Sequence, residues 1–77
     1  MSKQYVEIAP KTKGSRELIF LTNGDIIHKG GTGTVYEGQW FFINKQTKFV
    51  RRLPKATTYE EALEAYQQDT GNCIVGL

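Results

Sequence analysis

Two segments of the chain are apolar at successive positions, yet only one helix is available to cover them. The first segment runs over residues 17–29 and the second over residues 34–53. Side chains alternate between the two faces of a strand, so an unbroken apolar run loads both sides of a sheet. One short helix buries one side only, and the other side must close on itself as a barrel or meet a partner. This pattern predicts a small binding module.

The length and the cysteine content limit the number of domains and the cellular compartment that we expect. The 77 residues predict a single domain, 1–77. The one cysteine, Cys73, cannot form an intrachain disulfide, and we expect it to be a small buried hydrophobe in a reducing compartment. No apolar run approaches the ~18 residues of a membrane span, and the first residues lack the apolar region of a signal peptide. We therefore expect a cytoplasmic protein with no membrane partner.

Charge is divided unevenly along the chain. Residues 1–55 hold all ten lysines and arginines and four acids, a formal charge of +6, whereas residues 56–77 hold four acids and no base, a charge of −4. A basic half suits nucleic acid or an acidic protein surface. The other explanation is solubility combined with packing of one half against the other. The sequence leaves both open.

The first apolar segment predicts a hairpin. Asn23 and Gly24 separate two apolar runs, and both residue types tolerate the positive φ of a two-residue type I′ turn. The predicted strands are 17–22 and 25–29. With that turn, one face holds Leu18, Phe20 and Ile27, and the other face holds Ile19, Leu21 and Ile26.

The second apolar segment predicts another hairpin. A long strand over 34–43, with Gly38 as a bulge or bend, turns at 44–47 into a strand over 48–53 that Pro54 ends. Alternation places Tyr36, Trp40 and Phe42 on one face, and Val35, Phe41 and Ile43 on the other. Short strands are also expected at 5–8 and 73–75.

One helix is expected over residues 59–69. Thr58 and Glu61 form a capping box before it, and Gly71 is a typical C-terminal stop. Its apolar stripe consists of Tyr59, Ala62, Leu63 and Tyr66. The predicted fold is α+β, with a small curved antiparallel sheet of four to five strands and one helix in the C-terminal half. The alternative is a small SH3-like or OB-like barrel.

Catalytic and metal signatures are weak. His28 is the only histidine, and the two serines, Ser2 and Ser15, fall in predicted loose segments, so no catalytic triad is indicated. One histidine and one cysteine do not make a closed four-ligand metal site. We expect a non-enzymatic protein without a cofactor.

A glycine-rich stretch lies between the two hairpins. Residues 31–36, Gly-Thr-Gly-Thr-Val-Tyr, resemble the tail of a protein-kinase Gly-rich loop, which implies contact with phosphate. The lysine-bearing strand that should follow is replaced by Glu37-Gly38-Gln39-Trp40-Phe41-Phe42. Binding of a nucleotide or phosphate through Gly30–Gly33 is therefore a third-ranked function.

The second hairpin is the candidate contact surface, because basic and aromatic side chains alternate along it. Arginine forks onto carboxylates, and arginine and aromatic side chains dominate interface energetics. We expect the hairpin to engage an acidic protein, as a regulator, inhibitor or adaptor would. The alternative is single-stranded nucleic acid, whose bases stack on rings while cations follow the phosphates. A homodimer through the uncovered apolar face is also compatible. The candidate contact residues are Trp40, Lys45, Lys48, Phe49, Arg51, Arg52 and Lys55.

Overall fold

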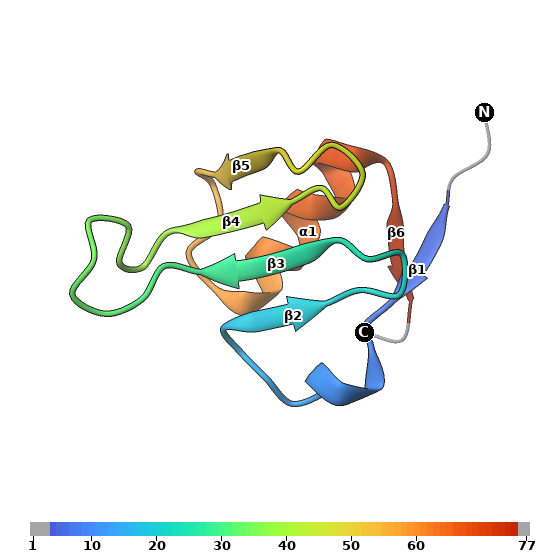
Figure 1. Ribbon diagram of the computed structural model, residues 1–77, viewed down its shortest axis with the longest axis horizontal. Coiled ribbons are helices and arrows are strands. Elements are labelled where there is room, and N and C mark those ends of the chain that lie inside the picture. Colours follow the sequence, from blue (N-terminus) through green and yellow to red (C-terminus); the bar gives the residue numbers. More distant parts are fainter. Residues whose placement is uncertain (1–3, 76–77) are drawn as a thin grey trace.

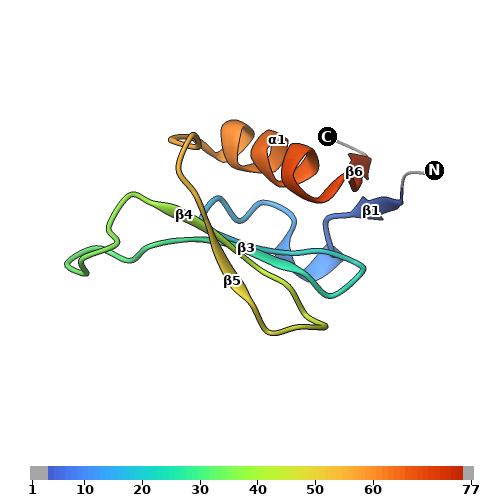
Figure 2. The same cartoon turned by 90° about the horizontal axis from the view of Figure 1, so that it is seen from above.

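The computed structural model describes residues 4–75 and has the predicted α+β class (Figure 1). Four antiparallel strands form a sheet in the order β2-β3-β4-β5, and one helix, α1, crosses one of its faces (Figure 2). The elements are β1 (Tyr5–Glu7), a short 3-10 helix η1 (Pro10–Thr12), β2 (Leu18–Phe20), β3 (Ile26–Lys29), β4 (Trp40–Ile43), β5 (Val50–Leu53), α1 (Tyr59–Thr70) and β6 (Cys73–Val75).

The two terminal strands form a small sheet of their own. β1 and β6 pair in parallel, with Val6 opposite Ile74, and both of these side chains are buried. The predicted strands at the two ends of the chain are confirmed. Their parallel pairing brings the described ends of the chain together beside α1 (Figure 2).

The four-stranded sheet does not close. Within residues 4–75, each strand of this sheet pairs only with its neighbours in the order β2-β3-β4-β5, so β2 and β5 are edges. The SH3-like or OB-like barrel is therefore not the fold. The face of the sheet that α1 does not cross is therefore not enclosed by closure of the sheet on itself.

The helix begins and ends where local signals predict. The Thr58 side chain accepts a hydrogen bond from the Glu61 N–H at 3.2 Å, and Gly71 adopts φ 78° after the last turn. The Glu61 carboxylate does reach back, but it accepts the N–H of Thr57 at 3.0 Å. Three stripe residues, Ala62, Leu63 and Tyr66, are buried against the sheet. Capping and amphipathic spacing thus account for α1.

The core lies between α1 and one face of the sheet. Ile19, Ile27, Trp40 and Phe42 supply the sheet side and are all buried. The ring of Tyr66 meets Phe42 edge-on, with the ring centroids 5.0 Å apart. Every strand of the sheet that α1 crosses therefore contributes to one contiguous core.

The turn of the first hairpin differs from the prediction. The Leu21 N–H donates to the Asp25 carbonyl at 2.9 Å, so the loop is 22–24, three residues long. Gly24 adopts φ 96°, which suits the last position of such a loop. The predicted two-residue type I′ turn at Asn23–Gly24 is wrong.

The additional loop residue changes which side chains of the first hairpin share a face of the sheet. Ile19 lies opposite Ile27, and both are fully buried, whereas Phe20 lies opposite Ile26 on the other face. The predicted grouping of Ile27 with Leu18 and Phe20 is therefore wrong. A slip of one residue moves a whole strand from one face to the other.

The second hairpin is shorter than predicted. β4 begins at Trp40, and residues 31–39 form a long loop, exposed over 31–38, that projects from the sheet (Figure 1). Tyr36 belongs to that loop and meets Phe41 edge-on at 5.3 Å between ring centroids. It therefore does not share a face with Trp40, contrary to the prediction. β5 begins only at Val50.

Candidate binding surface

The face of the sheet opposite α1 carries a continuous set of mostly apolar side chains. Strand register places eight residues there, and Figure 2 shows α1 on the other side of the sheet. Among the described residues, no helix or strand crosses this side. We call this set the open face, and it consists of Leu18, Phe20, Ile26, His28, Phe41, Ile43, Val50 and Arg52.

Aromatic rings cluster near the middle of the open face. His28 stacks on Phe41 with 5.4 Å between ring centroids, and Tyr36 packs edge-on against the same phenyl ring. The His28 Nε2 atom is buried and has no hydrogen-bond partner in the described part of the chain. Burial lowers the pKa of His28, which favours the neutral imidazole. The rings at the centre of the open face therefore form an uncharged cluster, even though one of them is a histidine.

Large apolar side chains are most exposed at the two edges of the sheet. Leu18 on β2 is 43% exposed and Val50 on β5 is 52% exposed. Phe49, in the turn before β5, is 62% exposed. A contiguous exposed apolar surface on a small domain marks an interaction site more often than scattered single residues do.

Cations border the open face, and none of its eight residues is acidic. The Lys11 Nζ lies 4.6 Å from the centroid of the Phe20 ring at the β2 edge. At the β5 edge, Arg52 belongs to the face itself and donates a 3.4 Å hydrogen bond to Gln39. Lys48 is exposed in the adjoining turn. The surface thus combines an apolar centre with a positively charged rim.

Part of the uneven charge distribution is accounted for by ion pairs between the basic half and the acidic half of the chain. Arg16 of the basic half pairs with Glu60 of the helix at 3.2 Å, and Arg51 pairs with Asp69 at 3.0 Å. The Arg16–Glu60 pair is solvent-exposed and the Arg51–Asp69 pair is partly exposed, so each stabilises the fold by about 1 kcal/mol or less. Packing of the basic half on the acidic half is therefore a real component of the charge pattern.

The predicted contact residues do not form one surface. Trp40 is 2% exposed and belongs to the core, so its ring is not available to a partner. Arg51 and Lys55 line the side that faces α1. Lys45 is exposed in the β4–β5 turn, where its N–H donates to Asp25 at 3.2 Å.

The remaining three predicted contact residues are exposed, and one of them belongs to the open face. Arg52 belongs to the open face, and Lys48 and Phe49 are exposed in the turn before β5. The prediction missed the apolar part of the surface, including Phe41 and Ile43. The two-sided apolar pattern signalled such a face, but only the register identified its members.

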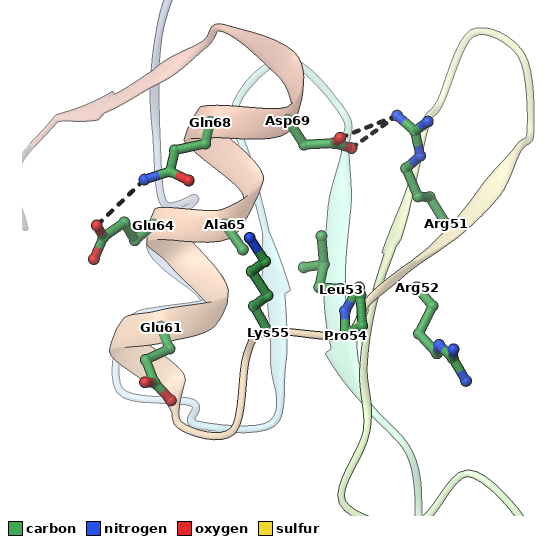
Figure 3. Close-up of a pocket in the computed structure, with 10 residues that line it drawn as sticks. All are labelled: Arg51, Arg52, Leu53, Pro54, Lys55, Glu61, Glu64, Ala65, Gln68 and Asp69. Atoms are coloured by element: carbon green, nitrogen blue, oxygen red, sulfur yellow. Dashed lines mark hydrogen bonds and ion pairs between the residues drawn. The ribbon is translucent and has the colours of Figure 1, made fainter.

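A groove separates β5 from α1 (Figure 3). Its cavity volume is about 580 Å³, and Leu53, Pro54 and Ala65 supply its apolar lining. The charged lining is balanced, with Arg51, Arg52 and Lys55 on the strand side and Glu61, Glu64 and Asp69 on the helix. Figure 3 shows Arg51 turned towards Asp69 and Arg52 turned away from the helix.

The glycine-rich loop is organised by its own side chains. Gly33 donates its N–H to the Glu37 carboxylate at 3.0 Å, and Thr34 donates to the Gly31 carbonyl at 2.7 Å. The carboxylate occupies the Gly33 N–H that a phosphate would need. This arrangement favours a connecting loop over a phosphate cradle.

Residues 4–75 contain no group of three or more His, Cys, Asp or Glu side chains placed to hold a metal ion. Within the same residues no helix has the length and apolarity needed to cross a membrane. Comparison with protein-family models, curated proteins and solved structures finds no match for this chain.

Proposed function

We propose that this protein is a non-enzymatic binding module that engages an acidic surface of a protein partner through the open face. The observation that carries the proposal is an uncovered apolar sheet face with basic side chains at its rim. Burial of apolar surface supplies the affinity in such a contact, at about 25 cal/mol per Å² before the costs of association. The cations supply steering towards a negatively charged partner and raise the association rate.

The aliphatic content of the face favours a protein over nucleic acid. Leu18, Ile26, Ile43 and Val50 offer no flat ring on which a base would stack. Protein interfaces have apolar centres and polar rims, which is the arrangement of this surface.

Single-stranded nucleic acid is the second candidate, and one observation favours it. His28, Phe41 and Tyr36 form a contiguous group of rings, and cations lie at the edges of the same sheet. Stacking of bases on such rings combined with phosphate contacts would give binding with little sequence preference.

The test compares matched exposed positions. Leu18→Asp and Val50→Asp each place a carboxylate on the open face, while Tyr5→Asp makes the same kind of change at a 70% exposed site on β1. Immobilised protein is incubated with nuclease-treated lysate, and the captured proteins are identified and ranked by charge. We expect an acidic protein to be held by the parent and by Tyr5→Asp, and to bind both open-face variants at least about tenfold more weakly.

The outcomes separate the candidates. Capture that is equal in all four proteins would contradict the open face as the binding site. In a parallel arm, a labelled single-stranded oligonucleotide is titrated at low salt. Binding with a log–log salt slope of ~0.7 per phosphate contact, lost on nuclease treatment, would instead support the nucleic-acid candidate. Sedimentation of the parent protein across a concentration series tests the homodimer.

A further inference from the structure

The two edges of the four-stranded sheet differ in whether their outward-pointing backbone groups have hydrogen-bond partners. At β2, the outward groups are occupied: Leu18 N–H donates to Ser15 Oγ at 3.3 Å, Phe20 N–H donates to Thr12 Oγ1 at 3.3 Å, and the Phe20 carbonyl accepts the Ala9 N–H at 2.7 Å. The segment before β2 thus caps this edge. At β5, no described strand or loop pairs with the outer side.

Strand register identifies the free groups on β5. Asn44 N–H donates to the Phe49 carbonyl at 2.9 Å, so residues 44 and 49 form a hydrogen-bonded pair. In an antiparallel ladder such pairs alternate with non-hydrogen-bonded pairs. Arg51 and Leu53 therefore bond to β4, while the N–H and C=O groups of Val50 and Arg52 point away from the sheet.

Space adjoins the part of this edge that Arg52 occupies, because Arg52 belongs to the lining of a groove. The groove between β5 and α1, with its volume of about 580 Å³, runs beside this edge (Figure 3). We propose that an extended segment of the acidic partner adds to β5 as a further strand at this edge. This inference rests on the proposed function and names how the partner docks. Strand addition uses main-chain hydrogen bonds for affinity and alternate side chains for specificity.

The side chains of β5 define the chemistry of the added strand. On the open face the new strand would run beside Val50 and Arg52, so an acidic side chain opposite Arg52 is favoured. On the other face it would lie against the apolar part of the groove, Leu53 and Ala65. Successive side chains of a strand point to opposite faces. The preferred segment therefore alternates acidic and apolar residues.

The same side chains disfavour a second copy of the chain at this edge. An antiparallel pair of β5 strands centred on residue 51 or 52 places like arginines directly opposite each other. Like charges in that position are destabilising, and charged edge strands resist self-pairing. An acidic partner strand converts the same repulsion into attraction.

The test uses synthetic peptides as probes. A fluorescein-labelled peptide that alternates Glu and Val is titrated into the full chain, alongside a block-sequence peptide of the same composition and a peptide with Lys in place of Glu. Two further versions of the alternating peptide carry N-methyl groups on every second amide, in one phase or the other. We expect only the alternating acidic peptide to bind, and only one methylation phase to weaken binding, by about tenfold or more.

Two protein variants locate the contact. Val50→Pro removes an outward N–H that the β4 ladder does not use, so we expect loss of peptide binding with little change in thermal stability. Arg52→Glu reverses the peptide preference from Glu to Lys, whereas the charge-matched control Lys13→Glu, in the exposed loop after η1, leaves it unchanged. Amide exchange at Val50 and Arg52 slows when the peptide is bound.

The outcomes distinguish this inference from the proposed function. Equal weakening by both methylation phases, or no peptide binding at all, would overturn strand addition. Peptide-induced shifts at His28 and Phe41 without protection of Val50 and Arg52 would also overturn it, but would retain the open face as the binding surface. Partner capture that is weakened by Leu18→Asp and unchanged by Val50→Pro would likewise overturn strand addition and retain the open face as the binding surface.

Discussion

The Tyr66 hydroxyl of α1 donates a 2.8 Å hydrogen bond to the Asp25 carboxylate at the end of the first hairpin loop. Asp25 is only 7% exposed, and it also accepts hydrogen bonds from the Asn23 side chain at 3.3 Å and the Lys45 N–H at 3.2 Å. A buried carboxylate is tolerated only when such donors surround it. This contact therefore ties the helix, the first hairpin and the β4–β5 turn together.

Removal of the Tyr66 hydroxyl tests that contact. Tyr66→Phe keeps the buried ring but withdraws a donor from Asp25, and we expect it to lower the free energy of unfolding by about 1–3 kcal/mol. Denaturant titration measures the change. Tyr59→Phe is the matched control on the same helix, where Arg16 covers the ring and the ring is only half-buried, and we expect it to be close to neutral. Equal effects of the two variants would contradict the role assigned to Asp25.

The same tyrosine predicts the alkaline limit of stability. Burial is the main cause that raises the pKa of Tyr66 above its ordinary value of 10.0, and the Asp25 charge adds to the effect. The folded state therefore favours the neutral phenol, and this contribution to stability is complete below about pH 10 and is lost as the pH rises through the higher folded pKa. Unfolding measured from pH 8 to 12 should show a fall in stability that is smaller in Tyr66→Phe. Superimposable profiles of stability against pH for the parent and Tyr66→Phe would contradict this role of the Tyr66 phenol.

The N-terminus of the helix predicts an effect on the acid side. Hydrogen bonds from Thr57 are the main cause that lowers the pKa of Glu61. A carboxyl with a lowered folded pKa stabilises the fold above its unfolded pKa, and this contribution is lost as the pH falls through the folded value. We expect NMR titration to show the Glu61 pKa rising towards its ordinary range in Thr57→Ala. A Glu61 pKa that is the same in both proteins would contradict the role assigned to the Thr57 side chain.

Packing of the helix on the sheet predicts a large effect at Leu63. Its side chain is buried in the core beneath α1, and Leu63→Ala should lower the free energy of unfolding by about 2–5 kcal/mol. Its neighbour Glu64 is exposed, so Glu64→Ala should change little. Thermal unfolding of the three proteins measures the difference. An unchanged melting temperature in Leu63→Ala would mean that α1 does not pack as described.

The loop between β3 and β4 predicts a contrast between two adjacent glycines. A Cβ on Gly30 would overlap the Tyr36 carbonyl oxygen, a backbone atom that cannot move aside alone. A Cβ on Gly31 would meet only the Thr34 methyl, at 3.9 Å. We therefore expect Gly30→Ala to destabilise the protein and to disturb the Tyr36–Phe41 contact, while Gly31→Ala is tolerated. Aromatic NMR signals and thermal unfolding report the two effects, and the opposite order would refute the loop geometry.

The sequence alone determined the elements whose signals are local. Thr58 and Gly71 mark the ends of α1, because capping hydrogen bonds join residues only three or four positions apart. The helix stripe and the two apolar hairpins followed from side-chain periodicity. So did the expectation that one helix could not bury both sheet faces, which left closure as a barrel and an uncovered face as the two alternatives.

Only the tertiary structure decided which side chains lie on that face. The register of the first hairpin depends on a three-residue loop that Asp25 closes, and Asp25 is held by Tyr66, 41 residues away in the chain. Trp40 is buried and Arg52 is exposed for the same reason: they belong to strands whose faces are assigned by packing against α1. Alternation along a strand predicts two faces but not which one is buried, because that choice is made by contacts between residues far apart in the sequence.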